Sequence, residues 1–511
     1  MTKSVIPFYQ PHLNAPLPTV IGHKDYKEFR SQLERIDELL IRGGVEEKFV
    51  ELCIEHKEKE LTKLIKNSED NSKTQLSAKQ TKMLGKVARC ALRCSIAREL
   101  TGASYRDFSN RLADSYLFQR FCLIDQLAVI KPPSKSTLQR YEKLVREDSL
   151  RKVIDYLNLQ AGTPLKETDK HPLNLEQPLD LEESFIDCTC IKANIHFPVD
   201  WVLLRDAVIS LISAIIVIRS HGLKNRIVEP KRFITRINNL CIQMGNSRRK
   251  KNAKKERKRL FRLMKELVKA VQKHGERYRE LLNLRREDTD LSEKQAAQII
   301  KRLDNILNQL PQAIKQANER IIGERLVKNE DKILSLHEDE IHVIVRGKAG
   351  AEVEYGNGLV LVEQKQGIII DYDLIKDQPP ADTSLVLPSL ERIHETFGIY
   401  PDAIGGDRGF DSGDVRKFLA NKSIYNGICP KSPKLLKERQ EEEKFRRLQK
   451  RRAQTEARIG ILKNSFLGRP LRSKGFENKE LSVGWAVLAH NLWSLARLLC
   501  CEQEKERSKA A

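Results

Sequence analysis

The chain has 511 residues, of which 92 are Lys or Arg and 70 are Asp or Glu, so its formal net charge at pH 7 is +22. This length allows a large buried core and about three domains, which excludes a small scaffold stapled by disulfides or metals. The basic balance favours a polyanion partner such as nucleic acid.

Membrane insertion is not expected. The start of the chain has no charged and then apolar signal pattern, and the longest apolar run, 207–218, is about half of a membrane span. The ten cysteines do not form paired hooks with zinc-ligand spacing, so reduced thiols are expected. These patterns predict a cytoplasmic protein.

The first 165 residues are predicted to be helical. Residues 1–75 hold an extended start, a charged helix and a polar linker at 67–75, and residues 76–165 hold several helices joined by short turns. After Pro133, either Ser134 or Ser136 could cap a helix whose exposed Lys135 and Arg140 suit contact with DNA. A helical bundle used only for dimerisation remains the alternative.

A strand is predicted near residue 186, and it carries Asp187 in its interior, where a carboxylate is unfavourable unless something compensates it. From 200 to 335 the chain is predicted to be helical and very basic. Phosphate contact is favoured over a merely solvated surface for its cation cluster, because a line of cations along DNA releases counterions. The cluster includes Arg248, Arg249, Lys250, Lys251, Lys254 and Lys255.

Strands are predicted to return at 340–350, 351–364 and 367–374, with turns at Gly347, Gly356 to Gly358 and Gly367. A helix follows, then a short strand that ends at Asp407, a helix, a last strand and the basic helix that holds Glu456. Without the 200–335 insertion this is an α/β domain of strands and their helices.

Glu456 lies in the basic stretch "RRAQTEARIGILKN" (451–464). On a regular helix Arg452 and Lys463 would share its face. A surface ion pair with Arg452 is one explanation. The other is that Glu456 joins Asp187 and Asp407 in a set of carboxylates that binds Mg²⁺, with two ions activating the attacking oxygen and stabilising the leaving oxygen of a phosphodiester.

Three motifs, in this order, resemble the DDE transposases of bacterial insertion sequences, a cut-and-paste group with a ribonuclease-H-like core. They are the acidic strand and turn "IDCTCIKANIHFPVD", the block "GGDRGFDS" and the helix "RAQTEARIGILK". A closing helix, "VGWAVLAHNLWSLARLL", also resembles the family. The resemblance covers most of residues 85–500 and implies a catalytic domain at 180–500, interrupted by 200–335, with a tail at 501–511.

The resemblance implies that Asp187, Asp407 and Glu456 are catalytic metal ligands, for two Mg²⁺ ions that Mn²⁺ could replace. It implies DNA contacts for Arg452, Lys463 and Arg408. Two departures matter: Gln449 stands where many relatives have tyrosine, and the insertion follows the first acidic strand. A base-flipping role for Trp201 is therefore less expected than a buried position.

The implied function is DNA transposition, a form of DNA recombination: binding of inverted-repeat ends, metal-dependent cleavage and strand transfer. Double-stranded DNA is the expected partner of a homodimer or higher assembly near the bacterial nucleoid, with no small-molecule substrate. The alternatives are a metal-dependent nuclease or resolvase without strand transfer, and a non-enzymatic DNA-binding protein derived from a transposase. Asp371, Asp411 and His490 are interpreted as structural residues.

Overall fold

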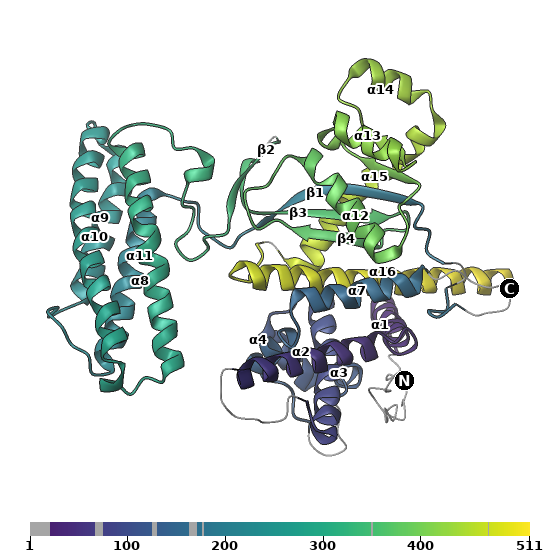
Figure 1. Ribbon diagram of the computed structural model, residues 1–511, viewed down its shortest axis with the longest axis horizontal. Helices are drawn as coiled ribbons and strands as arrows, with labels where there is room; N and C mark the ends of the chain where they lie inside the picture. Colours follow the sequence, from purple (N-terminus) through teal and green to yellow (C-terminus); the bar gives the residue numbers. More distant parts are fainter. Residues whose placement is uncertain are drawn as a thin grey trace. The chain divides into compact units, whose positions relative to one another are not determined.

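The computed structural model describes residues 21–66, 75–124, 130–162, 171–175, 178–348, 351–468 and 470–510. The predicted extended start up to residue 20 and nearly all of the predicted polar linker lie outside these residues. The chain forms two compact units (Figure 1). The first contains Met1–Ile191, Gly358–Ile375 and Pro380–Ala511, and the second contains Lys192–Asn357 and Lys376–Pro379.

The N-terminal part of the first unit is helical, as predicted. Ser77 opens one helix with a capping box, and Ser134, rather than Ser136, caps the helix that carries Lys135 and Arg140. The helices are α1 (Lys24–Arg42), α2 (Val45–Lys66), α3 (Ala78–Thr101), α4 (Tyr105–Asp114), α5 (Tyr116–Phe121), α6 (Lys135–Glu142) and α7 (Glu147–Ala161).

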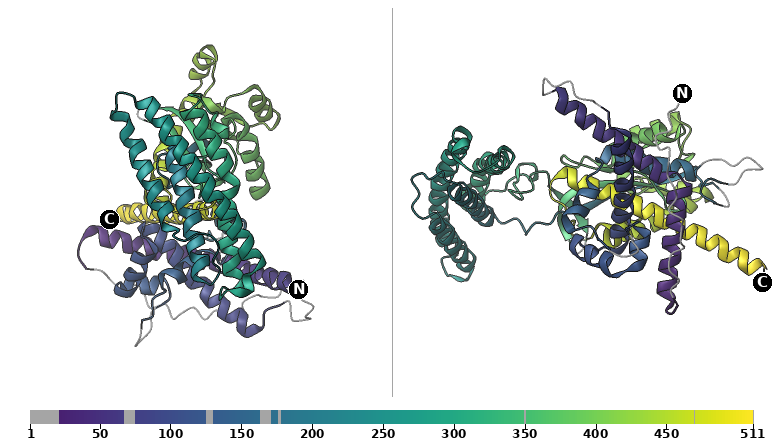
Figure 2. Two further views of the ribbon diagram at one scale, coloured as in Figure 1. Left: turned by 90° about the vertical axis from the view of Figure 1, so that its left-hand side faces the viewer. Right: turned by 90° about the horizontal axis from the view of Figure 1, so that it is seen from below.

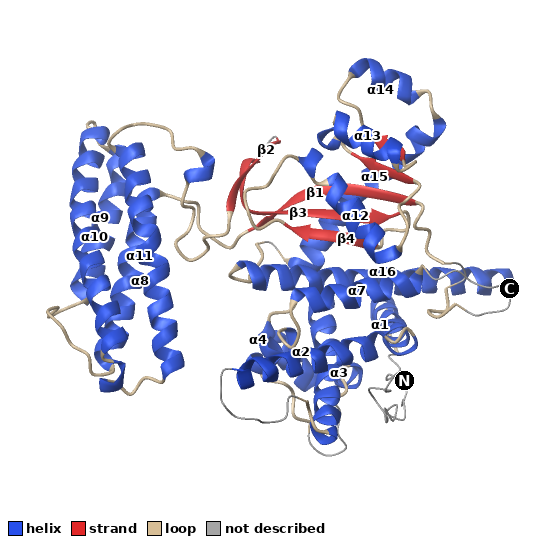
Figure 3. Ribbon diagram, in the orientation of Figure 1, coloured by secondary structure: helices blue, strands red, loops and turns tan. Residues whose placement is uncertain are grey.

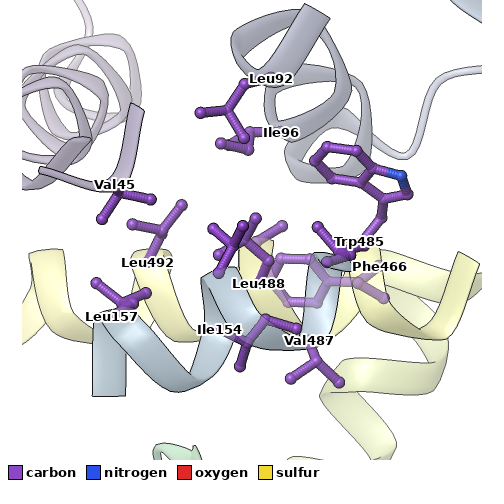
Figure 4. Packing of buried hydrophobic residues seen from close by; sticks show 14 of the residues in the cluster. Val45, Leu92, Ile96, Ile154, Leu157, Phe466, Trp485, Val487, Leu488 and Leu492 are labelled. Carbon is purple, nitrogen blue, oxygen red and sulfur yellow. The ribbon is translucent and has the colours of Figure 1, made fainter. Parts of the chain in front are cut away.

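These helices share a hydrophobic core with the last helix, α16 (Phe476–Ala510). Leu92 of α3 and Leu157 of α7 lie around Leu488 and Trp485 of α16 in Figure 4. The Trp485 indole is fully buried, and its Nε1 donates to the Glu142 carbonyl oxygen at 3.1 Å. The N-terminal helices therefore fold together with the end of the chain.

A six-stranded mixed sheet lies mostly in the first unit, and its strand residues 342–348 and 351–357 belong to the second unit (Figure 3). Its order is β2-β3-β1-β5-β6, with β4 also paired to β3; β1, β5 and β6 are parallel, whereas β2 and β4 are antiparallel to β3. The strands are β1 (Glu183–Lys192), β2 (His342–Lys348), β3 (Ala351–Gln364), β4 (Ile369–Leu374), β5 (Ala403–Gly406) and β6 (Tyr425–Ile428).

The predicted turn at Gly356 to Gly358 is wrong, because β3 runs through these residues. Gly356 pairs with His342 of β2, and Leu359 pairs with Leu374 of β4. Pairing along its length keeps β3 extended despite its glycines. The predicted turn at Gly367 is confirmed, with a left-handed φ of 91°.

Alternating side chains of β3 divide the core into two layers. Leu359 and Leu361 join the cluster formed with α16, whereas Val360 and Val362 pack with α12 (Val386–Phe397) and α13 (Gly413–Asn421). Two further helices, α14 (Pro433–Gln440) and α15 (Glu443–Ile461), follow β6, and a π-helical turn spans Leu462–Leu467. From β1 onward, the predicted order of strands and helices is confirmed.

The second unit contains four helices that run side by side (Figure 2): α8 (Asp200–Ser220), α9 (Lys231–Asn246), α10 (Ala253–Leu284) and α11 (Glu293–Ile321). The predicted apolar face of α10 is confirmed, since Leu260, Met264 and Val271 are buried in this bundle.

Within the described residues, α8 alone is long and apolar enough, by length and composition, to cross a membrane. The sequence estimate considered only the run at 207–218, but the helix begins earlier, at Asp200. Val208, Leu211 and Ile215 of α8 are buried in the core shared with α9, α10 and α11.

Two leucines of α7 test the shared core of the first unit. Leu157 is 0% exposed and Leu159 is 39% exposed on the same helix. We expect Leu157→Ala to lower the free energy of unfolding by about 2–5 kcal/mol, because it leaves a cavity against α16. Leu159→Ala should cost much less. Denaturant unfolding of both variants measures the difference, and equal losses would contradict the described packing.

Candidate active site

Asp187 and Asp407 occupy matching positions on neighbouring parallel strands. The register pairs Glu183 with Ala403 and Phe185 with Gly405. Continued by two residues, it places Asp187 opposite Asp407, the residue that follows β5. Neighbouring strands are about 4.8 Å apart, and side chains at paired positions point to the same face. The two carboxylates are therefore neighbours.

The face on which they lie is the one covered by α15. Phe185 packs with Leu448 of α15, whereas Ile186 packs with the α12 layer on the opposite face. Asp187 and Thr189 follow Phe185 with the two-residue period of a strand, so they share its face. This arrangement directs the Asp187 side chain toward the helix that carries Glu456.

Each aspartate is held by a local backbone hydrogen bond. The Cys188 amide donates to Asp187 Oδ1, and the Gly409 amide donates to Asp407 Oδ1, each at 2.7 Å. No described residue donates a hydrogen bond to Oδ2 of either side chain. A Cβ on Gly409 would lie 3.0 Å from Asp407 Oδ1 and 2.7 Å from Asp382 Oδ2. A larger residue at this position of the "DRG" sequence would therefore displace the Asp382 side chain and crowd Asp407.

Gln449 attaches α15 to the ends of β5 and β6. Its Nε2 donates to the carbonyl oxygens of Gly406 at 3.2 Å and Gly427 at 2.6 Å. Its Oε1 accepts a 3.3 Å bond from Arg452 Nε. Arg452 and Glu456 follow Gln449 along the helix by about one and two turns. The residue that replaces the family's tyrosine thus has a positioning role.

The opposite side of α15 is anchored by a buried carboxylate at the end of β3, Glu363. Its Oε1 accepts a hydrogen bond from Thr455 Oγ1 at 2.7 Å. The same oxygen lies 2.9 Å from Arg451 Nη2 and 3.5 Å from Arg458 Nη1. Because residues 451, 455 and 458 share one helix face, this anchor leaves Arg452 and Glu456 on another.

The environment of Asp187 combines burial with the charges of Asp407, Glu456 and Arg452. Burial raises the pKa of Asp187 to about 6; the charges of Asp407 and Glu456 also raise it, and the Cys188 amide and Arg452 oppose the shift. Like charges are thus concentrated around a partly buried carboxylate. A bound cation would relieve this repulsion.

The alternative explanation of Glu456 as an ion-pair partner of Arg452 is not supported. Glu456 is exposed, and within the described residues it forms no ion pair. No group of three or more His, Cys, Asp and Glu side chains in the described part of the chain is arranged to hold a metal ion. The donor set nevertheless fits Mg²⁺ chemically, since all three side chains supply hard carboxylate oxygens.

The predicted position of Lys463 is wrong. The prediction assumed a regular α-helix, but α15 ends at Ile461 and the chain continues as a π-helical turn. Lys463 is buried there, and its Nζ donates to Thr189 Oγ1 at 2.9 Å and to the Cys190 carbonyl oxygen at 2.6 Å. This lysine holds α15 against β1 and does not present a free amine to DNA.

Most of the other predicted DNA-binding cations are exposed, whereas Arg452 is half-buried. Arg408 follows Asp407 directly and lies in the short helix Arg408–Phe410. Lys135 and Arg140 lie on the solvent side of α6, where Leu138 is buried. In the second unit, Arg248, Arg249, Lys250, Lys251, Lys254 and Lys255 are all exposed, at and after the connection between α9 and α10.

The acids and the histidine interpreted as structural have protein partners. Asp371 is buried and accepts two bonds from Arg392, at 2.9 and 2.7 Å. Asp411 binds Arg416 and the Lys431 amide. His490 is buried and bonded to its neighbour Asn491. These interpretations agree with the structure.

Sequence reasoning missed Gln449 and Glu363 as the residues that position α15. A signal for Glu363 was present, since a charged residue ends the apolar strand "LVLVEQ". Its partners, however, lie far along the chain and could not be assigned without the fold.

Comparison with known families identifies the region that holds two of these acids. Residues 346–492 match the family model of the transposase DDE domain. This match is consistent with a DDE transposase. It contains Asp407 and Glu456, and it begins after Asp187 and the second unit's helices. No curated protein and no solved structure gave a match.

The raised pKa of Asp187 makes a prediction for stability. Because the folded state binds this proton more tightly than the unfolded chain, the associated stability is present at low pH and is lost as the pH rises through about 6. In chelator, Asp187→Asn should therefore raise Tm at pH 8 by a few degrees. The gain should shrink toward pH 4.

Thermal unfolding at both pH values measures this effect. Asp402→Asn is a matched control, because Asp402 is exposed just before β5. Lower stability of Asp187→Asn at pH 8 would contradict the described charge crowding.

The contrasting environments of Lys463 and Arg452 make a second prediction. Lys463→Met should destabilise the protein by about 1–3 kcal/mol, since it leaves the carbonyl of Cys190 and the hydroxyl of Thr189 without their buried donor. Arg452→Met should leave stability nearly unchanged. Denaturant unfolding of both variants decides the assignment, which fails if Lys463→Met unfolds like the wild type.

Proposed function

We propose that this protein is a DNA transposase that binds the inverted-repeat ends of an insertion sequence and catalyses Mg²⁺-dependent cleavage and strand transfer. The observation that carries the proposal is the placement of Asp187 on β1 and of Asp407 directly after the neighbouring parallel strand β5, with Glu456 on the helix that covers them. The match to the transposase DDE domain supports the same reaction class.

A ribonuclease-H-like core is part of this proposal. The order β4-β3-β1-β5-β6 within the sheet supports it, with β1, β5 and β6 parallel to one another and β4 antiparallel to β3. The acidic strand β1 is central, and Asp407 follows the carboxyl end of its parallel neighbour. Ligands of open α/β sheets bind beyond the carboxyl ends of parallel strands.

In the proposed site, Asp187, Asp407 and Glu456 hold the metal ions. DDE transposases generally use divalent ions; we propose two Mg²⁺, with Mn²⁺ as a substitute. When bound, such ions activate the attacking oxygen and stabilise the leaving oxygen during phosphodiester displacement. Asp187, with a pKa near 6, is mostly ionised at neutral pH and can serve as a ligand.

The cations beside the acids have a separate role in the proposal. Arg452 is oriented by Gln449 and lies near enough to Asp187 to lower the pKa of that carboxyl. The Arg452 guanidinium can therefore hold a phosphate of the scissile strand beside the acids. Arg408, exposed beside Asp407, can hold a neighbouring phosphate. Fixing the strand in this way would position the phosphodiester for attack.

DNA outside the cleavage site would be bound by other surfaces. Lys135 and Arg140 of α6 would contact terminal repeats, and the basic cluster of the second unit would contact flanking DNA. We propose that a dimer or higher assembly in the bacterial cytoplasm pairs the two ends. DNA affinity should then fall steeply with salt.

The test is cleavage and joining of a plasmid that carries the gene with its native flanks, with Mg²⁺ present. Glu456→Gln should reduce both steps at least about 100-fold, because it removes a charged metal ligand, while DNA binding persists. Glu443→Gln is the matched control, since Glu443 is exposed in the first turn of the same helix.

Each outcome has a distinct meaning. Wild-type activity in Glu456→Gln would contradict the three-acid site. Metal-dependent cutting by the wild type without joined products would favour a nuclease or resolvase. DNA binding without either reaction would favour a non-enzymatic protein derived from a transposase.

A further inference from the structure

The second unit contains a cavity of about 320 Å³ that the proposed reaction does not use. Its walls come from the segment before α8, the first turns of α8 and α10, the short helix Ser247–Arg249 and the end of α11. Its size lies at the lower end of the range for small-ligand pockets. The side chains that line it combine aromatic rings with a strong excess of positive charge.

The cavity carries five cations and two carboxylates. Asp200 is buried and accepts hydrogen bonds from Gln316 Nε2 at 2.9 Å and Arg320 Nη1 at 3.0 Å. Glu324 pairs with Lys254 at 3.0 Å and Lys258 at 2.9 Å. The two acids therefore hold three of the cations in place without neutralising them all.

The remaining two cations, Arg248 and Arg257, have no carboxylate partner among the described residues. Arg257 Nε donates to Ser247 Oγ at 3.3 Å, which orients the guanidinium next to the short helix that carries Arg248. Arginine is the side chain best suited to paired hydrogen bonds with phosphate oxygens. These two residues give the cavity an unsatisfied capacity for an anion.

Two aromatic rings line the same cavity. Phe197 is 70% exposed, and its ring meets Tyr355 edge-on at 5.7 Å. Trp201 is partly buried against the helical core, so one side of its ring is covered as expected and the rest lines the cavity. A simple solvated cation patch needs no exposed phenylalanine beside it. Positive charge beside aromatic faces is the combination that binds unpaired nucleotides.

We propose that this cavity binds one nucleoside monophosphate unit, with its phosphate at Arg248 and Arg257 and its base against Trp201 and Phe197. The unit comes from a single-stranded DNA end or from a free nucleotide. The DNA end as ligand rests on the proposed function. The capacity of the cavity to bind a nucleotide rests only on its side chains.

The experiment measures binding by the full-length protein in chelator, so it does not depend on catalysis. Fluorescence anisotropy compares a blunt duplex with the same duplex bearing a 5′-phosphorylated single-stranded overhang. We expect tighter binding of the overhang, and we expect Arg248→Ala and Phe197→Ala each to reduce this preference at least about fivefold. Lys251→Ala is the control, an exposed cation of the same cluster that does not line the cavity.

A second assay distinguishes a DNA end from a free nucleotide as the ligand. It measures the quenching of tryptophan fluorescence by dAMP, with inorganic phosphate for comparison. If dAMP quenches the wild type but not Arg248→Ala, and the wild type shows no preference for the overhang, the ligand of the pocket is a free nucleotide. If neither dAMP nor the overhang were preferred, or if Lys251→Ala had the same effect as Arg248→Ala, the cavity would be only part of a general basic surface. That result would leave the cleavage test of Glu456 unaffected.

Discussion

The buried carboxylate of Glu363 is the interaction on which the candidate active site depends. It ends β3 and is bonded to Arg451, Thr455 and Arg458, all on one face of α15. Because removing one partner of a buried ion pair typically costs about 3–5 kcal/mol, this contact fixes the rotation of the helix firmly. Lys463 fixes the far end of the helix against β1, and Gln449 fixes the near end against β5 and β6. Arg452 and Glu456 are consequently held toward Asp187 without bonding to any strand themselves.

The charged residues of α15 have separate roles, which explains why this helix contains so many of them. Arg451 and Arg458 serve the fold, Gln449 and Lys463 hold backbone and side-chain groups of the strands, and Arg452 and Glu456 remain for chemistry. The site itself opposes folding, since Asp407 and Glu456 lie near the partly buried carboxylate of Asp187, whose pKa rises to about 6. Apolar packing on the same face of the sheet, such as the Phe185 and Leu448 pair, offsets that cost. Conflict between local stability and charge is common at catalytic sites.

The sequence contained much of this arrangement. The spacing of strands and helices predicted the order of elements from β1 onward, and the motifs predicted that Asp187, Asp407 and Glu456 act together, an assignment that stays a prediction until tested. The strand register gives it a geometric basis. Lys463 was misplaced because helical geometry was extended through a π-helical turn, which no local pattern signals. The turn at Gly356 to Gly358 was wrong because pairing of β3 with β2 and β4 overrides the preference of glycine. Gln449 and Glu363 could not be assigned, since their roles depend on partners distant in sequence.

The central claim is that Asp187, Asp407 and Glu456 form a single divalent-ion site, and direct ion binding tests it most simply. Calorimetric titration of Mn²⁺ into the full-length protein at pH 7.5 should show binding that weakens at least about tenfold in both Asp407→Asn and Glu456→Gln, with Glu443→Gln behaving as the wild type. Binding unchanged in both variants, or equally weakened in Glu443→Gln, would contradict a shared site.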